Sequence, residues 1–127
     1  MAEPATYKIL VVEDEPIIAM FLEVMLNDLG HDVAAVATTI DEALKLADSL
    51  DIDVAIIDLT LNGQSAIRVV ERLHAKLTPL ILASGGRRDD VDSRFSEVVW
   101  LQKPYRQIEV GRAIEQALAR AAALPTT

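Results

Sequence analysis

Five polar residues follow apolar stretches of this sequence, at points where buried segments would end. Asp58 closes the stretch AIID, Glu13 and Asp14 follow KILVV, Ser84 closes PLILAS, and Lys103 follows VVWLQ. Each has an ordinary explanation, because an acid before a helix caps it, a serine after a strand makes a turn, and a lysine before proline is solvated. Together, three carboxylates, a hydroxyl and an ammonium would suit a cation and a phosphoryl group.

Carboxylates that share one site need a positive charge beside them. Three of them within about 4–5 Å would repel by a few kcal/mol per pair at an effective dielectric of roughly 20. Mg²⁺ prefers oxygen ligands from carboxylates and phosphoryl groups, whereas the DxDxDG spacing of a looped calcium site is absent here. Asp58 would then be the nucleophile that accepts a phosphoryl group, and Lys103 and backbone N–H groups would hold the remaining oxygens.

The elements that must position these residues alternate along the chain. Short apolar stretches with branched residues predict strands, and apolar residues at helical spacing predict helices between them. Strands are predicted at KILVVED, DVAAVA, VAIID, PLILAS and VVWLQ, and helices over 16–29, 38–50, 65–76 and 106–123, with a short helix within 85–97. The alternation predicts a doubly wound, flavodoxin-like α/β domain with a five-stranded parallel sheet and five helices.

Local signals set the helix ends and the buried faces. Pro16 suits a first turn, Gly30 supplies a stop, and Thr39 with Glu42 forms a capping-box pattern. The apolar residues at helical spacing are Ile17, Ile18, Phe21, Leu22, Met25, Leu26 and Leu29 in the first helix, Ile67, Val70, Leu73 and Leu77 in the third, and Val110, Ile114, Ala117 and Ala121 in the last. We expect these residues to face the core.

The carboxyl ends of parallel strands lie at one edge of a sheet, and the loops that follow them form the ligand-binding crevice of an open α/β domain. Each of the five polar residues follows a strand of the predicted sheet. We therefore expect them to meet in one crevice.

Composition excludes several classes of function. The 127 residues carry a net charge of −8, so a basic surface for direct nucleic-acid binding is not expected. The chain has no cysteine, which excludes disulfides and thiolate metal sites. It lacks a signal-peptide pattern and any apolar stretch of the ~20 residues that span a bilayer, so we expect a soluble, cytoplasmic protein without membrane insertion. We expect one domain over 1–127, with a core over about 7–120 and a frayed tail over 121–127.

The ordered motifs resemble the receiver domain of two-component response regulators, over about residues 7–120. That family carries an acidic pair after strand one, a phosphoacceptor after strand three, a serine or threonine after strand four and Lys-Pro after strand five; the matching residues are Glu13, Asp14, Asp58, Ser84, Lys103 and Pro104. The resemblance implies a cis Lys103–Pro104 peptide. It also implies Mg²⁺ ligation by Glu13, Asp14, Asp58 and the backbone carbonyl of Thr60.

The resemblance further implies a stand-alone receiver that accepts a phosphoryl group on Asp58 from a histidine kinase or a histidine phosphotransfer protein. Beyond catalysing its own phosphorylation and dephosphorylation, the protein is not expected to be an enzyme. Its output would lie in a downstream protein partner, in a homodimer or in a phosphorelay, and the sequence leaves these three open.

Further residues have expected roles around the phosphoryl group. Gly85 follows Ser84 and lacks a Cβ, so its backbone N–H can approach a phosphoryl oxygen closely. Leu59 is expected to belong to the same phosphate-contacting loop. Ser84 and Trp100 are expected to form the conformational switch, although a static packing role fits Trp100 equally well.

The loop after Asp58 departs from the family pattern. Asn62 and Ala66 stand where the family often has proline and glycine. The resemblance therefore does not set the conformation of this loop.

Three other functions are alternatives. A phosphorylation-independent interaction module would be expected to lose site residues, and none is lost here. A phosphohydrolase with an aspartate nucleophile normally has an acid two residues later, where this chain has Thr60. A flavin site needs a phosphate-binding loop after the first strand, where EDEPII is acidic and would repel phosphate.

Overall fold

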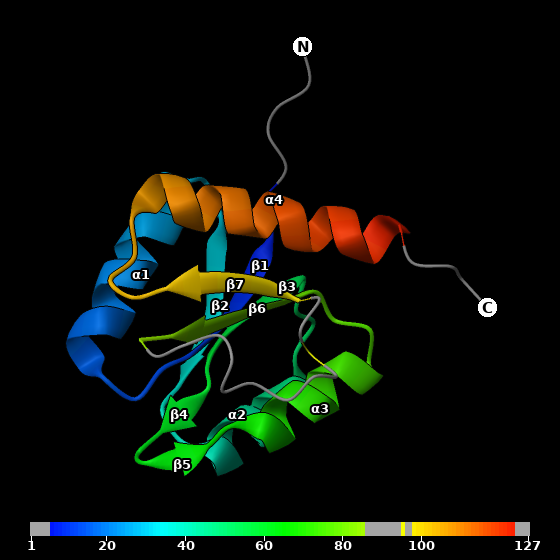
Figure 1. Cartoon of the computed structure of the whole chain (residues 1–127). Helices are drawn as coiled ribbons and strands as arrows, with labels where there is room; N and C mark the ends of the chain where they lie inside the picture. The colour runs from blue at the N-terminus through cyan, green and yellow to red at the C-terminus, as the bar shows by residue number, and fades with distance from the viewer. Residues whose placement is uncertain (1–5, 86–94, 96–97, 124–127) are drawn as a thin grey trace.

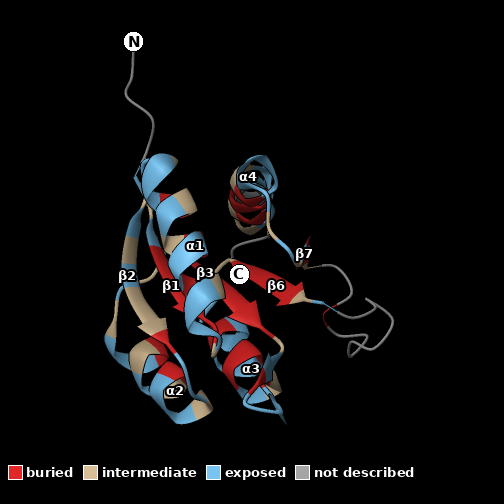
Figure 2. Cartoon of the chain, turned by 90° about the vertical axis from the view of Figure 1, so that its left-hand side faces the viewer, coloured by how far each residue is buried: buried red, intermediate tan, exposed pale blue. Residues whose placement is uncertain are grey.

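A five-stranded parallel sheet forms the centre of the protein in the computed structural model, which describes residues 6–85, 95 and 98–123. Its strands are β1 (Lys8–Val12), β2 (Asp32–Ala37), β3 (Val54–Asp58), β6 (Leu80–Ser84) and β7 (Val99–Gln102), in the spatial order β2-β1-β3-β6-β7 (Figure 1). The central strands are almost fully buried, as their branched apolar residues predict (Figure 2). From β1 the chain continues to β2 on one side, and from β3 it continues to β6 on the other side. The strand order therefore reverses between β1 and β3, where a crevice is expected.

Helices cover both faces of the sheet. They are α1 (Pro16–Asp28), α2 (Ile40–Ser49), α3 (Ile67–Ala75) and α4 (Gln107–Ala123). Helices α1 and α4 pack on one face and α2 and α3 on the other, and each pair shares a core cluster with the sheet (Figure 1). The predicted flavodoxin-like fold is confirmed. Of the five predicted helices, four lie within the described residues, and the segment of the fifth, 85–97, falls mostly outside them.

The helix-end signals act as the sequence predicts. Gly30 follows α1 with a φ of 88°, a conformation that favours glycine, and the N–H of His31 donates to the carbonyl of Leu26 (3.0 Å). At the start of α2, the N–H of Glu42 donates to Oγ1 of Thr39 (3.1 Å). The Glu42 carboxylate accepts from the N–H of Thr38 (2.8 Å), so the capping box spans one residue more than its usual pattern.

A small hairpin lies between β3 and α3 that the sequence reading did not predict. It pairs β4 (Thr60–Leu61) with β5 (Gln64–Ser65) across a two-residue turn. Since Ser65 belongs to this hairpin, the predicted helix over 65–76 begins later, at Ile67, and ends at Ala75. The expectation that Leu77 faces the core is wrong, because the helix has ended and Leu77 is 75% exposed with a φ of 62°.

The apolar residues of α1 divide between two faces. Leu22 and Leu26 are buried as predicted, together with Ala19. The prediction that Ile17 and Phe21 face the core is wrong: they are 66% and 55% exposed. Met20 and Val24 are also more than half exposed, so one side of α1 presents an apolar surface, here called the α1 face, formed by Ile17, Met20, Phe21 and Val24.

No helix in the described part of the chain is long and apolar enough to cross a membrane.

Candidate functional site

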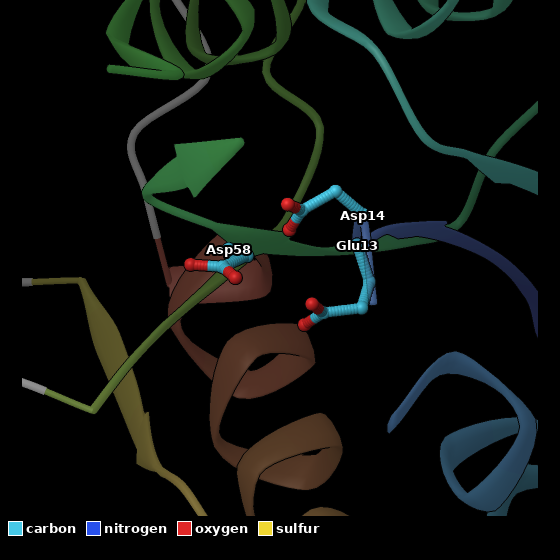
Figure 3. Close-up of side chains that lie close together, drawn as sticks. All are labelled: Glu13, Asp14 and Asp58. Atoms are coloured by element: carbon cyan, nitrogen blue, oxygen red, sulfur yellow. The ribbon is translucent and has the colours of Figure 1, made fainter. Parts of the chain in front are cut away.

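Three carboxyl groups meet at the carboxyl ends of β1 and β3. Glu13 and Asp14 follow β1, and Asp58 is the last residue of β3, its neighbour in the sheet. Each of the three offers an oxygen within 4.8 Å of the others, and Figure 3 shows the side chains facing a common space. Glu13 is 1% exposed and Asp58 is 7% exposed. The sequence therefore brings these acids together at the reversal of strand order, in the crevice that the topology predicts.

Lys103 reaches the same place from the far side of the sheet. Lys103 follows β7, and strand β6 lies between β7 and β3. The backbone N–H of Lys103 donates to the carbonyl of Ser84 (3.3 Å). The Lys103 Nζ lies 2.6 Å from Oδ2 of Asp58 and 2.9 Å from Oε2 of Glu13. One ammonium thus compensates two largely buried carboxylates.

Burial and charge act in opposite directions on these groups. Burial raises the pKa of Glu13, and the negative charge of Asp58 adds to this rise, while Lys103 and the N–H of Glu15 oppose it. For Lys103, burial disfavours the charged form, but the hydrogen bond to Asp58 and the contact with Glu13 outweigh it and raise its pKa. The lysine is therefore held as a cation, whereas burial disfavours the ionised form of Glu13.

The donor set fits a hard divalent cation. Oε2 of Glu13 is buried, and the Lys103 ammonium 2.9 Å away is its charged partner. Three carboxylates with oxygens within 4.8 Å of one another provide the oxygen ligands that Mg²⁺ prefers. Thr60, whose backbone carbonyl is the remaining predicted ligand, lies in β4 beside them.

The two backbone N–H groups that follow Asp58 donate hydrogen bonds to different partners, one in the sheet and one in the site. The N–H of Leu59 donates to the carbonyl of Ala83 (3.1 Å), as a continuation of the β3–β6 pairing. The expected place of Leu59 in the phosphate-contacting loop stays a prediction, and its backbone N–H is engaged in the sheet. The N–H of Thr60 instead donates to Oδ1 of Asp58 (3.1 Å).

A contact to the third acid was missed from the sequence. The N–H of Asn62, in the turn of the hairpin, donates to Oδ2 of Asp14 (3.0 Å). The Asn-Gly pair at 62 and 63 is a strong hairpin signal that could have located this turn.

Of the other predicted site residues, Ser84 and Gly85 lie at the same edge of the sheet and Trp100 lies within β7. Ser84 ends β6, is half-buried and is adjacent to Gly85, which is exposed and has open space where a Cβ would stand. Trp100 lies in β7, half-buried against the core cluster that α2 and α3 share with the sheet. The Lys103–Pro104 peptide is cis, the isomer that the resemblance implies.

A pocket adjoins the site on the α1 side. It has a volume of about 480 Å³ and is lined by Ile18, Phe21, Met25, Lys103, Pro104 and Tyr105. Burial, and then the negative charges of Glu13, Asp58 and Glu15, raise the pKa of Tyr105, so its hydroxyl stays neutral. The pocket connects the α1 face with the lysine that contacts Asp58.

Comparison with protein families and curated proteins gives one consistent family. The family model of the response regulator receiver domain matches residues 9–115 of this chain. The chain is 34% identical over 121 residues to the phyllosphere-induced regulator PhyR of Methylorubrum extorquens and 31% identical over 117 residues to the regulatory protein VanR of Enterococcus faecium. These alignments cover 92% and 89% of this chain but 45% and 50% of those proteins. The chain thus spans about half the length of these curated relatives.

Solved structures give the same family. The solution structure of SdrG from Sphingomonas melonis Fr1 is 39% identical, with a TM-score of 0.81, over 91% of this chain and 99% of that chain. The receiver domain of the PhyR response regulator from Erythrobacter litoralis is 29% identical, with a TM-score of 0.83, over 97% of both chains.

Proposed function

Because the chain belongs to the response regulator receiver domain family of two-component systems, we propose that Asp58 accepts a phosphoryl group from a phosphohistidine. The donor is a histidine kinase or a histidine phosphotransfer protein, and the reaction depends on Mg²⁺. The observation that carries this proposal is the position of Asp58, a largely buried carboxylate with Lys103 Nζ at 2.6 Å and two further acids in the same crevice.

In the proposed reaction an oxygen of Asp58 attacks the phosphorus atom of the donor. A P–O bond forms, the P–N bond breaks, and the imidazole nitrogen keeps the electron pair and takes up a proton. The Lys103 ammonium moves from compensating the carboxylate to pairing with the phosphoryl oxygens, and the N–H of Thr60 keeps Asp58 oriented.

Glu13, Asp14, Asp58 and the carbonyl of Thr60 would hold the Mg²⁺ ion in this proposal. Bound there, the ion would neutralise the negative charge that the acids and the phosphoryl group bring together. Glu13 is 1% exposed and offers a carboxylate oxygen within 4.8 Å of those of Asp14 and Asp58, which supports its assignment as a ligand.

After transfer, residues at the edge of the sheet would contact the phosphoryl group. Ser84, at the end of β6, would hydrogen-bond it, and the N–H of Gly85 would contact it. Trp100 pairs with Leu82 in the register of β6 and β7, so a shift of these strands would change its surroundings. The role of Ser84 and Trp100 as a switch stays a proposal.

The α1 face is where the donor protein would dock. Its four apolar residues follow helical spacing and are each more than half exposed, which is unusual for a helix that already buries its other side. The neighbouring pocket extends from Phe21 to Lys103, whose ammonium contacts Asp58. A donor seated there would bring its phosphohistidine next to Asp58, and this continuity favours a donor as the occupant.

Transfer from a phosphorylated histidine phosphotransfer protein tests the function and the docking face together. The label is expected to move to this chain with Mg²⁺ and to stay on the donor when the ion is chelated. A double variant, Ile17→Gln with Met20→Gln, is expected to slow this transfer about thirtyfold, since two interface anchors that contribute roughly 1 kcal/mol each together contribute about 2 kcal/mol.

The control is Leu77→Gln, an equally exposed apolar residue away from α1, which is expected to leave transfer unchanged. Phosphorylation by a small donor such as acetyl phosphate is expected to be the same in all three proteins, because it needs no docking surface. Equal transfer rates in the double variant and the wild type would refute the docking face. Absence of any phosphorylation, from protein or small donor, would instead favour the phosphorylation-independent module.

A further inference from the structure

The turn at the tip of the β4–β5 hairpin lies directly against the proposed metal site. Asn62 and Gly63 have φ values of 51° and 77°, and a two-residue hairpin turn with positive φ at both positions is the type that Asn-Gly favours. The hairpin is anchored at its base, where Leu61 is 1% exposed and the N–H of Ala66 donates to the carbonyl of Leu59 (2.7 Å). Its tip is therefore held in one place.

Asn62 makes two contacts from this turn, in different directions. Its backbone N–H donates to Oδ2 of Asp14 (3.0 Å), and its side-chain Nδ2 donates to the carbonyl of Thr38 (3.0 Å). The first contact fixes one oxygen of Asp14. The second ties the turn to the connection between β2 and α2.

The chain of hydrogen bonds continues beyond Thr38. The N–H of Thr38 donates to Oε1 of Glu42 (2.8 Å), and the N–H of Glu42 donates to Oγ1 of Thr39 (3.1 Å). These are the contacts that cap α2. A continuous hydrogen-bonded path thus runs from the Asp14 carboxylate through Asn62 to the first turn of α2.

We propose that Asn62 is a positioning residue, whose turn holds Asp14 in the orientation that shares a cation with Glu13 and Asp58 and couples cation binding to the first turn of α2. This inference rests on the proposed function, because it requires that Mg²⁺ binds the three acids. Partners that hold a ligand in place contribute strongly to metal affinity, because an unconstrained carboxylate must be ordered when the ion binds. The Thr38 tether supplies that constraint through the side chain of Asn62.

The variant Asn62→Gly isolates the tether. Glycine adopts a positive φ readily and keeps the backbone N–H, so only the Nδ2–Thr38 contact is removed. We expect the Mg²⁺ dissociation constant, measured by calorimetric titration, to be about tenfold larger in this variant. We also expect the amide NMR signals of Thr38 and Glu42 to shift with Mg²⁺ in the wild type and to lose that response in the variant.

Gln64→Ala is the matched control, since Gln64 is exposed in the same hairpin and is expected to leave both readouts unchanged. Asn62→Ala provides a second variant that keeps the backbone N–H and adds no charge but cannot donate to Thr38, and it is expected to weaken Mg²⁺ binding by a similar factor. Wild-type affinity and an unchanged Glu42 response in both Asn62 variants would overturn the inference alone. A wild type that binds no Mg²⁺ would overturn the inference together with the proposed function.

Discussion

The Asp58→Asn variant is expected to gain no phosphoryl group from acetyl phosphate and Mg²⁺, under conditions in which the wild type gains one by intact mass. The amide is close in shape to the carboxylate but is a poor nucleophile, so the loss reports chemistry rather than misfolding. Lys103 keeps its ion pair with Glu13 in this variant, and the fold is expected to persist.

The control for this experiment is Asp51→Asn, an exposed aspartate outside the sheet, which is expected to be phosphorylated like the wild type. A mass gain that persists in Asp58→Asn would move the phosphoacceptor to another residue. A loss in both variants would point to general damage instead.

Lys103→Met is expected to slow phosphorylation by a factor on the order of 100, as the loss of one charge that stabilises the transferring group does in other sites. It should also destabilise the metal-free protein by about 3 kcal/mol at neutral pH, because two buried carboxylates lose the cation they share. Urea unfolding with and without Mg²⁺ measures this effect. Added Mg²⁺ is expected to stabilise the variant more than the wild type, since the ion replaces the missing charge.

The pH dependence of this variant has a definite sign. Burial raises the pKa of Glu13 in the folded protein, and removal of Lys103 raises it further. A carboxyl group with a raised folded-state pKa contributes stability that is complete below its unfolded pKa and is lost as the pH rises through the folded one. The Lys103→Met protein is therefore expected to regain stability as the pH falls from neutral toward the ordinary range of glutamate. Lys45→Met, at an exposed lysine of α2, is the control, and a loss of stability equal to that control would contradict the role of Lys103.

The fold was predictable because strand and helix signals alternate without interruption. The site followed from the fold, since Asp58 ends β3, Glu13 and Asp14 follow β1, and parallel strands end at one edge. Lys103 was also found this way, although its contact with Glu13 as well as Asp58 depends on side-chain reach that no sequence pattern encodes.

The hairpin was missed because its strands are only two residues long and carry no alternating apolar pattern. Asn62 was noted only as a departure from the family, and its contact with Asp14 joins residues 48 positions apart. The role expected for Leu59 stays a prediction; the β3–β6 ladder continues through its N–H, and the N–H of Thr60 is the one that donates to Asp58.

The buried face of α1 was misjudged for a different reason. Apolar residues occupy two sides of this helix, so helical spacing alone could not decide that Leu22 and Leu26 face the sheet while Ile17 and Phe21 face outward.

Locating the phosphoryl group on the chain tests the central claim most directly. Borohydride reduces an aspartyl phosphate to homoserine, and tandem mass spectrometry of the digested protein then identifies the residue. Acids from β1 and β3 that share one cation predict homoserine at position 58 when Mg²⁺ is present and none when it is chelated. Modification at any other residue, or equal modification at position 58 without the ion, would contradict that claim.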